Sequence, residues 1–144
     1  NGGVTGSTTS GGLSRISWYF KNPPDYLILA LGANDGLRGI APLETKKNLG
    51  SILKLAAEQG IPCMLAGMKL PPNYGIKYLD SFENIFPQLA EENNIPLLPF
   101  LLEGVGGNPT MNLPDRIHPN PSGHRKICKT VFHHFTEHFS TLSL

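Results

Sequence analysis

Asp115 and His118, in the stretch Asp115-Arg116-Ile117-His118-Pro119, have the residue types and spacing of an acid–base pair. A carboxylate three residues from an imidazole can hold one ring nitrogen, which fixes the tautomer and stabilises the imidazolium. Pro119 disfavours helical geometry at His118, so the pair is expected on a loop. The same spacing also suits an ordinary exposed histidine. A metal site is less well supported, because no other histidines or carboxylates have the spacing of metal ligands. The remaining histidines are expected on a C-terminal helix, where they are solvated or partly packed: His124, His133, His134 and His138.

Two glycine-containing stretches can supply hydrogen-bond donors to a developing oxyanion. Asn34 lies in Gly32-Ala33-Asn34-Asp35-Gly36, directly after an apolar run, where its side-chain amide can be directed into a cleft. Gly6 lies in Thr5-Gly6-Ser7-Thr8, where its backbone amide can be a second donor. Taken singly, the first stretch also suits an ordinary turn and the second an ordinary helix N-cap region.

The elements that must position these residues alternate along the chain. Continuous apolar runs predict buried strands at 26–31, 61–67 and 95–99. Helical periodicity predicts helices at 9–21, 43–59, 77–93 and from Pro121 onward, with Pro87 kinking or breaking the third. This alternation is typical of an α/β protein with a parallel sheet and helices on both faces. Sites in such sheets form beyond the carboxyl ends of the strands, which favours the loops 32–39, 68–76 and 100–120.

Composition excludes several classes of protein. A length of 144 residues suits one domain, and 40% hydrophobic with 16% charged residues indicates a packed globule. The net charge is +1 and the basic residues are scattered, so nucleic acid is not an expected partner. The apolar runs are too short for an integral membrane segment, which needs roughly 20 residues. Cys63 and Cys128 are expected to be buried thiols.

Taken together, the Thr5–Thr8, Gly32–Asp35 and Asp115–Pro119 blocks resemble the SGNH, or GDSL, hydrolase family in order and spacing. The resemblance is closest to its thioesterase I, lysophospholipase L1 and arylesterase branch. That branch is also indicated by GANDGLRG at 32–39, LPPNYG at 70–75 and IPLLPF at 95–100. The resemblance implies a three-layer α/β/α sandwich with a flavodoxin-like, five-stranded parallel sheet. It also implies hydrolysis of esters and thioesters through an acyl-serine intermediate, without a metal or other cofactor.

By this resemblance, His118 corresponds to the general base and acid, and Asp115 to its orienting partner. Gly6 and Asn34 correspond to two of the three oxyanion donors. The loop at 68–76, with Leu70, Pro71 and Tyr74, is expected to line the acyl pocket or, alternatively, to be a rigid connection without ligand contact.

The nucleophile departs from the family pattern. The family places its serine in a Gly-Asp-Ser block at the end of the first strand, and no serine of this chain lies in such a block or in a Gly-x-Ser-x-Gly turn. Ser7 is nearest the site but matches the oxyanion turn. We therefore expect the chain to be a single SGNH domain, 1–144, truncated at its N-terminus by a strand–helix–strand unit of about 30 residues or more. Such a chain is expected to be poorly stable and inactive alone, and to require the missing segment or a strand-donating partner.

The sequence thus predicts part of a serine esterase or thioesterase acting on small acyl esters of the arylesterase, lysophospholipase or acyl-thioester type. The alternatives are an inactive pseudo-hydrolase that binds acyl ligands or a partner, and a carbohydrate-ester deacetylase of the same superfamily. A periplasmic or secreted location is implied by the resemblance alone.

Overall fold

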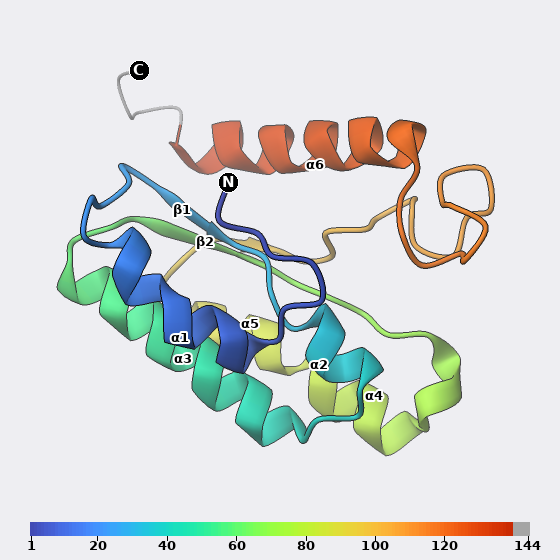
Figure 1. Ribbon diagram of the computed structural model, residues 1–144, viewed down its shortest axis with the longest axis horizontal. Helices are drawn as coiled ribbons and strands as arrows, with labels where there is room; N and C mark the ends of the chain where they lie inside the picture. The colour runs from blue at the N-terminus through green and yellow to red at the C-terminus, as the bar shows by residue number, and fades with distance from the viewer. Residues whose placement is uncertain (140–144) are drawn as a thin grey trace. The chain divides into compact units, whose positions relative to one another are not determined.

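The computed structural model describes residues 1–139, and the chain forms two compact units divided between Pro99 and Phe100. The first unit contains a parallel sheet with helices α1 to α5, and the second contains an irregular segment followed by helix α6 (Figure 1). No helix within residues 1–139 combines the length and apolar character needed to cross a membrane.

The sheet has three parallel strands in the order β1-β2-β3, which confirms the α/β class. The strands are β1 (Leu27–Leu29), β2 (Cys63–Ala66) and β3 (Leu97–Leu98), each within a predicted apolar run. Leu27 pairs with Cys63, and Leu65 pairs with Leu97. All four residues of β2 are buried because this strand lies between the other two.

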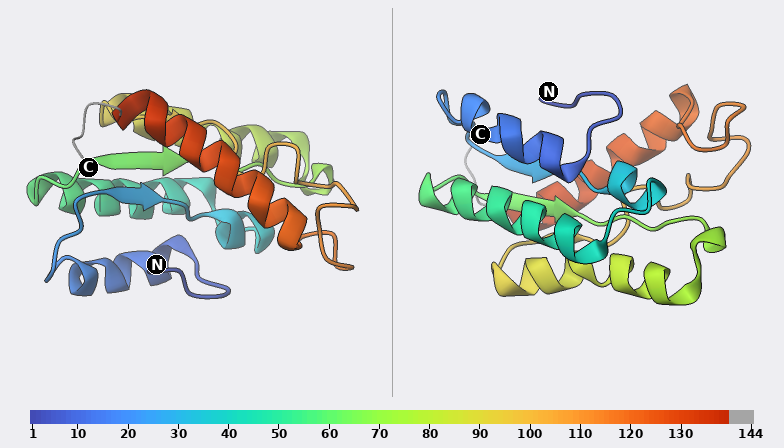
Figure 2. Two further views of the ribbon diagram at one scale, coloured as in Figure 1. Left: turned by 90° about the horizontal axis from the view of Figure 1, so that it is seen from above. Right: turned by 60° about the horizontal axis from the view of Figure 1, so that its bottom comes forward.

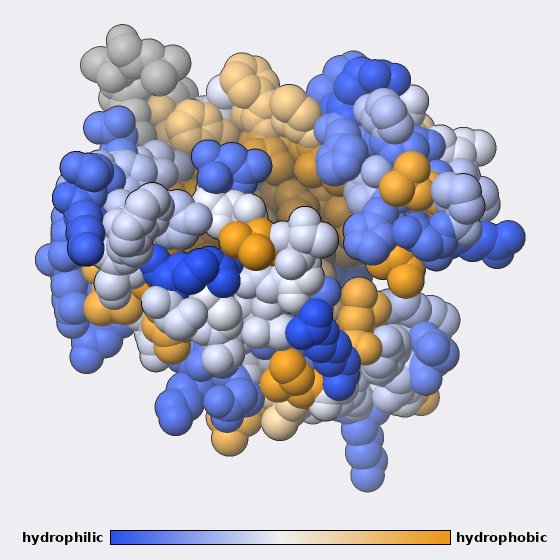
Figure 3. All heavy atoms as spheres, in the orientation of Figure 1, coloured by the Kyte–Doolittle hydropathy of each residue, from blue (hydrophilic) through white to orange (hydrophobic). Residues whose placement is uncertain are grey.

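Three helices form a layer against this sheet. They are α1 (Thr9–Tyr19), α3 (Pro42–Glu58) and α5 (Ile85–Glu92), and Figure 2 shows α3 between α1 and α5. Their apolar faces meet the strands in one core that includes Leu49, Ile52, Leu65, Phe82 and Phe86. Figure 3 shows mainly hydrophilic and neutral residues on the outer side of this layer, with hydrophobic residues as isolated spots. The helices are therefore amphipathic in the way their periodicity predicts.

The predicted helix at 77–93 is two helices, and the break is not at Pro87. Helix α4 (Ile76–Glu83) ends at Asn84, and α5 begins at Ile85. Pro87 lies in the first turn of α5, where backbone N–H groups have no partner within the helix, so its missing N–H costs little there.

Two predicted loops contain short helices. The 32–39 segment forms α2 (Ala33–Leu37), and the 68–76 segment contains the 3-10 helix η1 (Pro72–Tyr74). Gly36 allows the two segments to pack closely, because a Cβ there would lie 2.5 Å from Leu70 Cδ2 and 2.9 Å from Phe82 Cε2. The apolar contact with Leu70 and Phe82 is a tertiary effect that local turn chemistry does not reveal.

The second unit contains α6 (Pro121–Phe139), which begins at the predicted proline. Asn120 caps this helix, since its side-chain oxygen accepts from Ser122 N at 2.9 Å and from Gly123 N at 3.0 Å. Cys63 is buried as expected, and burial raises the pKa of its thiol to about 11. Cys128, predicted to be buried, is exposed on α6, where Gly123 is the buried residue, so the burial expected for this thiol was wrong.

Candidate active site

Asn34 lies in the first turn of α2 and is half-buried. Its side-chain Nδ2 donates to the carbonyl oxygen of Ser7 at 3.1 Å. An amide carries two N–H donors, so one holds the Ser7 segment while the other remains for a further acceptor. The structure therefore brings Asn34 to the turn that contains Gly6, as a shared oxyanion site requires.

Gly6 occupies a tight turn whose backbone is open to an acceptor. Ser7 N donates to Val4 O at 3.1 Å, and Gly6 has φ +71°, a conformation that favours glycine. Arg38 Nη2 donates to Gly6 O at 2.9 Å and holds the turn from the outside. Within residues 1–139, the N–H of Gly6 takes part in no hydrogen bond. That N–H is available to an acceptor from outside the described residues.

Asp35 joins these segments from inside the core, and sequence reasoning missed it. Its carboxylate is 1% exposed and accepts from Thr9 N at 2.8 Å and from Thr9 Oγ1 at 2.5 Å. Asn48 on α3 donates to Thr9 Oγ1 at 3.1 Å and completes the network. A signal was present, because Asn48 and Thr45 place polar side chains on the buried face of α3 that also carries Leu49 and Ile52. A buried polar side chain on such a face must find partners.

The three residues predicted to line an acyl pocket, Leu70, Pro71 and Tyr74, differ in their contacts and in their burial. Tyr74 donates to Leu37 O at 2.9 Å, which ties the 68–76 segment to the end of α2. Leu70 packs against the core beside Gly36, whereas Pro71 is exposed. The segment is thus clamped to the helix that carries Asn34, and the Tyr74 hydroxyl is engaged in that clamp.

In the second unit, the structure brings Asp115 and His118 together. Asp115 Oδ2 lies 2.8 Å from His118 Nδ1, while Oδ1 accepts from the backbone N of Ile117 and of His118, each at 2.9 Å. The backbone hydrogen bonds from His118 and Ile117, followed by the His118 side chain, lower the pKa of Asp115 to about 2. The carboxylate is therefore ionised at neutral pH and acts as an acceptor for Nδ1–H. This leaves Nε2 of the neutral ring to accept a proton.

The turn that carries this pair is fixed by its backbone. Arg116 has φ +61°, a left-handed conformation uncommon for a residue other than glycine. Leu113 N donates to His118 O at 2.7 Å, and Asn112 pairs with Pro119 in an isolated antiparallel bridge. Asn112 Nδ2 donates to the carbonyl oxygens of Val105 and Asn108 at 2.6 and 2.7 Å. Sequence reasoning missed Asn112, which anchors the base of the turn.

Five serine hydroxyls of the described residues are engaged with arginine side chains or backbone carbonyls. The Ser7 hydroxyl accepts from Arg15 Nη2 at 2.9 Å, and the Ser122 hydroxyl accepts from Arg125 Nη2 at 3.0 Å. Helical carbonyls three or four residues earlier accept from Ser14, Ser51 and Ser81. Ser140 and Ser143 lie outside the described residues.

Asp35→Asn should destabilise the protein by about 1–3 kcal/mol, because the amide nitrogen cannot accept and one Thr9 donor loses its partner in the core. Urea denaturation monitored by circular dichroism would measure this. Asp80→Asn, at an exposed position of α4, is the matched control and should change stability by no more than about 0.5 kcal/mol. Equal effects of the two substitutions would contradict the role assigned to Asp35.

The Asp115 carboxyl should titrate with a midpoint near its lowered pKa of about 2, against an ordinary value of 3.8. NMR of the side-chain carboxyl carbon would measure it. His118→Ala keeps both backbone donors, so its midpoint should rise above the wild-type value yet stay below 3.8. Because the folded pKa is lowered, the stabilisation from this turn is present above pH 3.8 and is lost as pH falls through about 2. A wild-type midpoint at 3.8 would contradict the hydrogen bonding described.

Comparison with known proteins identifies the family of this chain. The sequence matches the GDSL-like Lipase/Acylhydrolase family over residues 1–126. It is 37% identical to the arylesterase of Vibrio mimicus, over 96% of this chain and 70% of the relative. It is 39% identical to thioesterase 1/protease 1/lysophospholipase L1 of Escherichia coli K12, over 83% of this chain and 58% of the relative.

A solved structure agrees with the sequence comparisons. The crystal structure of TesA superposes with a TM-score of 0.91 at 36% identity, over 95% of this chain and 77% of that chain. This chain thus spans between 58% and 70% of the length of the two curated relatives. The blocks around Gly6, Asn34 and His118 lie within the matched range, and the chain belongs to the GDSL-like lipase/acylhydrolase family.

Proposed function

We propose that this chain provides the base and two oxyanion donors of a serine hydrolase that cleaves carboxylic esters or thioesters. The observation that carries the proposal is the contact between Asp115 Oδ2 and His118 Nδ1 at 2.8 Å. An imidazole held at Nδ1 by an ionised carboxylate is oriented to take a proton at Nε2. The names of the relatives, arylesterase and thioesterase, support the same reaction class.

In this mechanism His118 removes the proton from a serine hydroxyl as the serine oxygen attacks the acyl carbonyl. The imidazolium formed is stabilised by Asp115, and it then gives its proton to the leaving alcohol or thiol. Water attacks the acyl-serine in the second half of the cycle, with His118 again the base. Each step moves a proton between His118 and a reacting oxygen or sulfur, so no metal or cofactor is required.

Gly6 and Asn34 stabilise the negatively charged oxygen of the tetrahedral intermediates. The unengaged N–H of Gly6 and the second N–H of Asn34 are the proposed donors to the oxyanion. The bond from Asn34 to Ser7 O keeps these two donors in register. Donors that are fixed before reaction stabilise the developing charge without reorganising.

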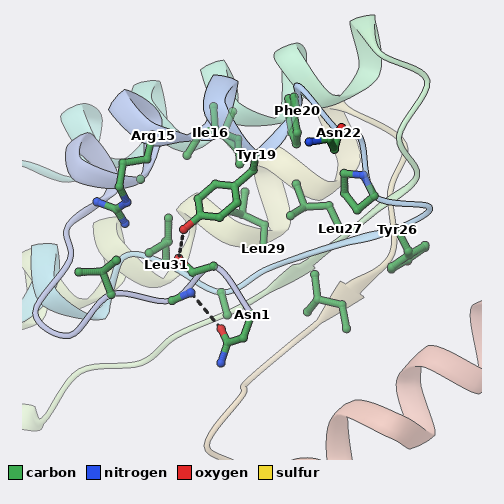
Figure 4. Close-up of a pocket in the computed structure, with 18 residues that line it drawn as sticks. Asn1, Arg15, Ile16, Tyr19, Phe20, Asn22, Tyr26, Leu27, Leu29 and Leu31 are labelled. Carbon is green, nitrogen blue, oxygen red and sulfur yellow. Dashed lines mark hydrogen bonds between the residues drawn. The ribbon is translucent and has the colours of Figure 1, made fainter.

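The nucleophilic serine is proposed to reside on a strand that pairs with the outer edge of β1. Among the described residues, β1 has β2 on one side and no strand on the other. A cavity of about 580 Å³ lies along this strand, lined by residues of α1, β1 and the first four residues. Figure 4 shows Leu27, Leu29 and Leu31 there, with Tyr19, whose hydroxyl donates to Gly2 O at 3.2 Å. An apolar cavity beside a strand edge can accept one more strand.

The proposed substrates are small acyl esters or thioesters of the arylesterase, lysophospholipase or acyl-thioester type. Leu70 and Pro71 are the proposed apolar lining for the acyl group, with Tyr74 holding their segment in place. In this proposal residues 1–144 act as a single functional domain that is completed by the serine-bearing strand.

A fluorophosphonate probe tests the proposal, because it labels only serines activated by a base. The chain of 144 residues is compared with a longer protein in which a strand ending in Gly-Asp-Ser precedes it, each with a His118→Ala counterpart. Labelling of the longer protein alone, lost in His118→Ala, is the expected result. Labelling of the 144-residue chain would show that one of its own serines is the nucleophile. Labelling of neither folded protein would favour a pseudo-hydrolase that binds acyl groups without cleaving them.

Asn34→Ala in the longer protein should lower kcat by about 10²–10³-fold with little change in KM, because its donor acts on the oxyanion. Steady-state hydrolysis of an aryl ester would measure both constants. Asn84→Ala, at an exposed residue between α4 and α5, is the control and should leave both unchanged. Small and equal effects of Asn34→Ala on kcat and KM would refute its role.

A further inference from the structure

Helix α6 brings together three side chains of the kind that bind metal ions. His134, Glu137 and His138 each place one ligand atom within 4.8 Å of the others. Spacings of three and four residues put all three on one face of the helix. From the sequence these histidines are expected to be solvated or partly packed, and no ligand spacing stands out; on the helix, two of them come together with Glu137.

We propose that His134, Glu137 and His138 form a binding site for a divalent transition-metal cation of the Zn²⁺, Cu²⁺ or Ni²⁺ type. Imidazole and carboxylate together suit these ions better than Mg²⁺ or Ca²⁺, which prefer oxygen ligands alone. Three protein ligands leave at least one coordination position for water or another molecule. The site is distinct from Asp115 and His118 and does not depend on the proposed hydrolysis.

His138 is held in the tautomer that a metal ligand needs. Its Nδ1 lies 2.9 Å from the backbone carbonyl oxygen of His134. A carbonyl oxygen only accepts, so Nδ1 carries the proton in this contact and the Nε2 lone pair is left for a metal ion. Histidines that bind metals are commonly fixed by a hydrogen bond of this kind at the other ring nitrogen.

His134 and Glu137 face each other across a gap that suits an ion. His134 Nδ1 lies 4.0 Å from Glu137 Oε2, and this nitrogen has no hydrogen-bond partner among residues 1–139. The distance is too long for a hydrogen bond. Two ligand atoms of a tetrahedral site with metal–ligand bonds of about 2.0–2.2 Å lie roughly 3.3–3.6 Å apart, so a side-chain rotation that shortens this distance by about half an ångström would bring both atoms onto one ion.

Two neighbouring contacts pre-position the ligands. His133 Nε2 lies 3.3 Å from Glu137 Oε1, which directs the second carboxylate oxygen, Oε2, toward His134. The His134 and His138 rings are nearly parallel, with an interplanar angle of 12° and centroids 6.5 Å apart.

Isothermal titration of the tag-free protein with Zn²⁺ and with Cu²⁺, at slightly alkaline pH where protons compete less for imidazole, tests the site. One ion should bind per chain, with Cu²⁺ tighter than Zn²⁺ and with no binding of Mg²⁺. His134→Gln, His138→Gln and Glu137→Gln should each weaken Zn²⁺ binding about tenfold or more. His124→Gln, on the same helix but away from the cluster, should leave the affinity unchanged. Far-UV circular dichroism would confirm that every variant keeps its helices.

Co²⁺ provides an independent readout, because a coordinated Co²⁺ ion absorbs in the visible range in a way that reports its ligands. That absorption should appear with the wild type and disappear with His138→Gln. His118→Ala should bind Zn²⁺ as the wild type does. Absence of binding to the wild type, binding unchanged by the His134 and His138 substitutions, or binding lost in His118→Ala would each overturn the proposal.

Discussion

The organisation of the first unit depends on one buried carboxylate. Asp35 is 1% exposed, and Thr9 supplies both of its hydrogen-bond donors. Thr9 is the first residue of α1, so its N–H is one of the donors that a helix leaves without an internal partner. A carboxylate at this end also interacts favourably with the helix dipole. This interaction thus gives the N–H of Thr9 a hydrogen-bond partner and offsets the free-energy cost of burying the Asp35 carboxylate. It also fixes α1 against α2.

This constraint places the two residues proposed as oxyanion donors, Gly6 and Asn34. Thr9 follows the Gly6 turn within three residues, and Asp35 follows Asn34 directly. Once Asp35 is bonded to Thr9, the Gly6 turn and Asn34 are adjacent, and the Asn34–Ser7 hydrogen bond forms between them. The site is therefore supported from the core. Tyr74 and Leu70 support it from the other side by packing the 68–76 segment on α2.

The Asp115–His118 pair depends on local hydrogen bonds instead. Asp115 and His118 are three residues apart, and one carboxylate organises the whole turn by accepting from two backbone amides and the ring. Asn112 and Asn120 connect this turn to the preceding segment and to α6. Such a local arrangement is visible in the sequence as a spacing, because the interacting groups are close along the chain. The Asp35 network joins residues 26 positions apart, so a polar Asn48 on the buried face of α3 can be noticed in the sequence, but no spacing there pairs Asp35 with Thr9.

The sequence by itself determined the elements, their α/β class, and the three blocks around Gly6, Asn34 and His118. Apolar runs and helical periodicity indicate which residues are buried locally, and short motifs indicate local turns. Both kinds of pattern can therefore be recognised without knowledge of the fold. Only the tertiary structure decided that 77–93 breaks at Asn84, that Gly32–Gly39 contains a helix, and that Asp35, Thr9 and Asn48 form a buried network. It also showed Cys128 exposed and placed the ligand atoms of His134, Glu137 and His138 within reach of one ion. These features depend on which groups meet in space, and a linear pattern of residue types does not encode contacts between distant segments or side-chain orientation.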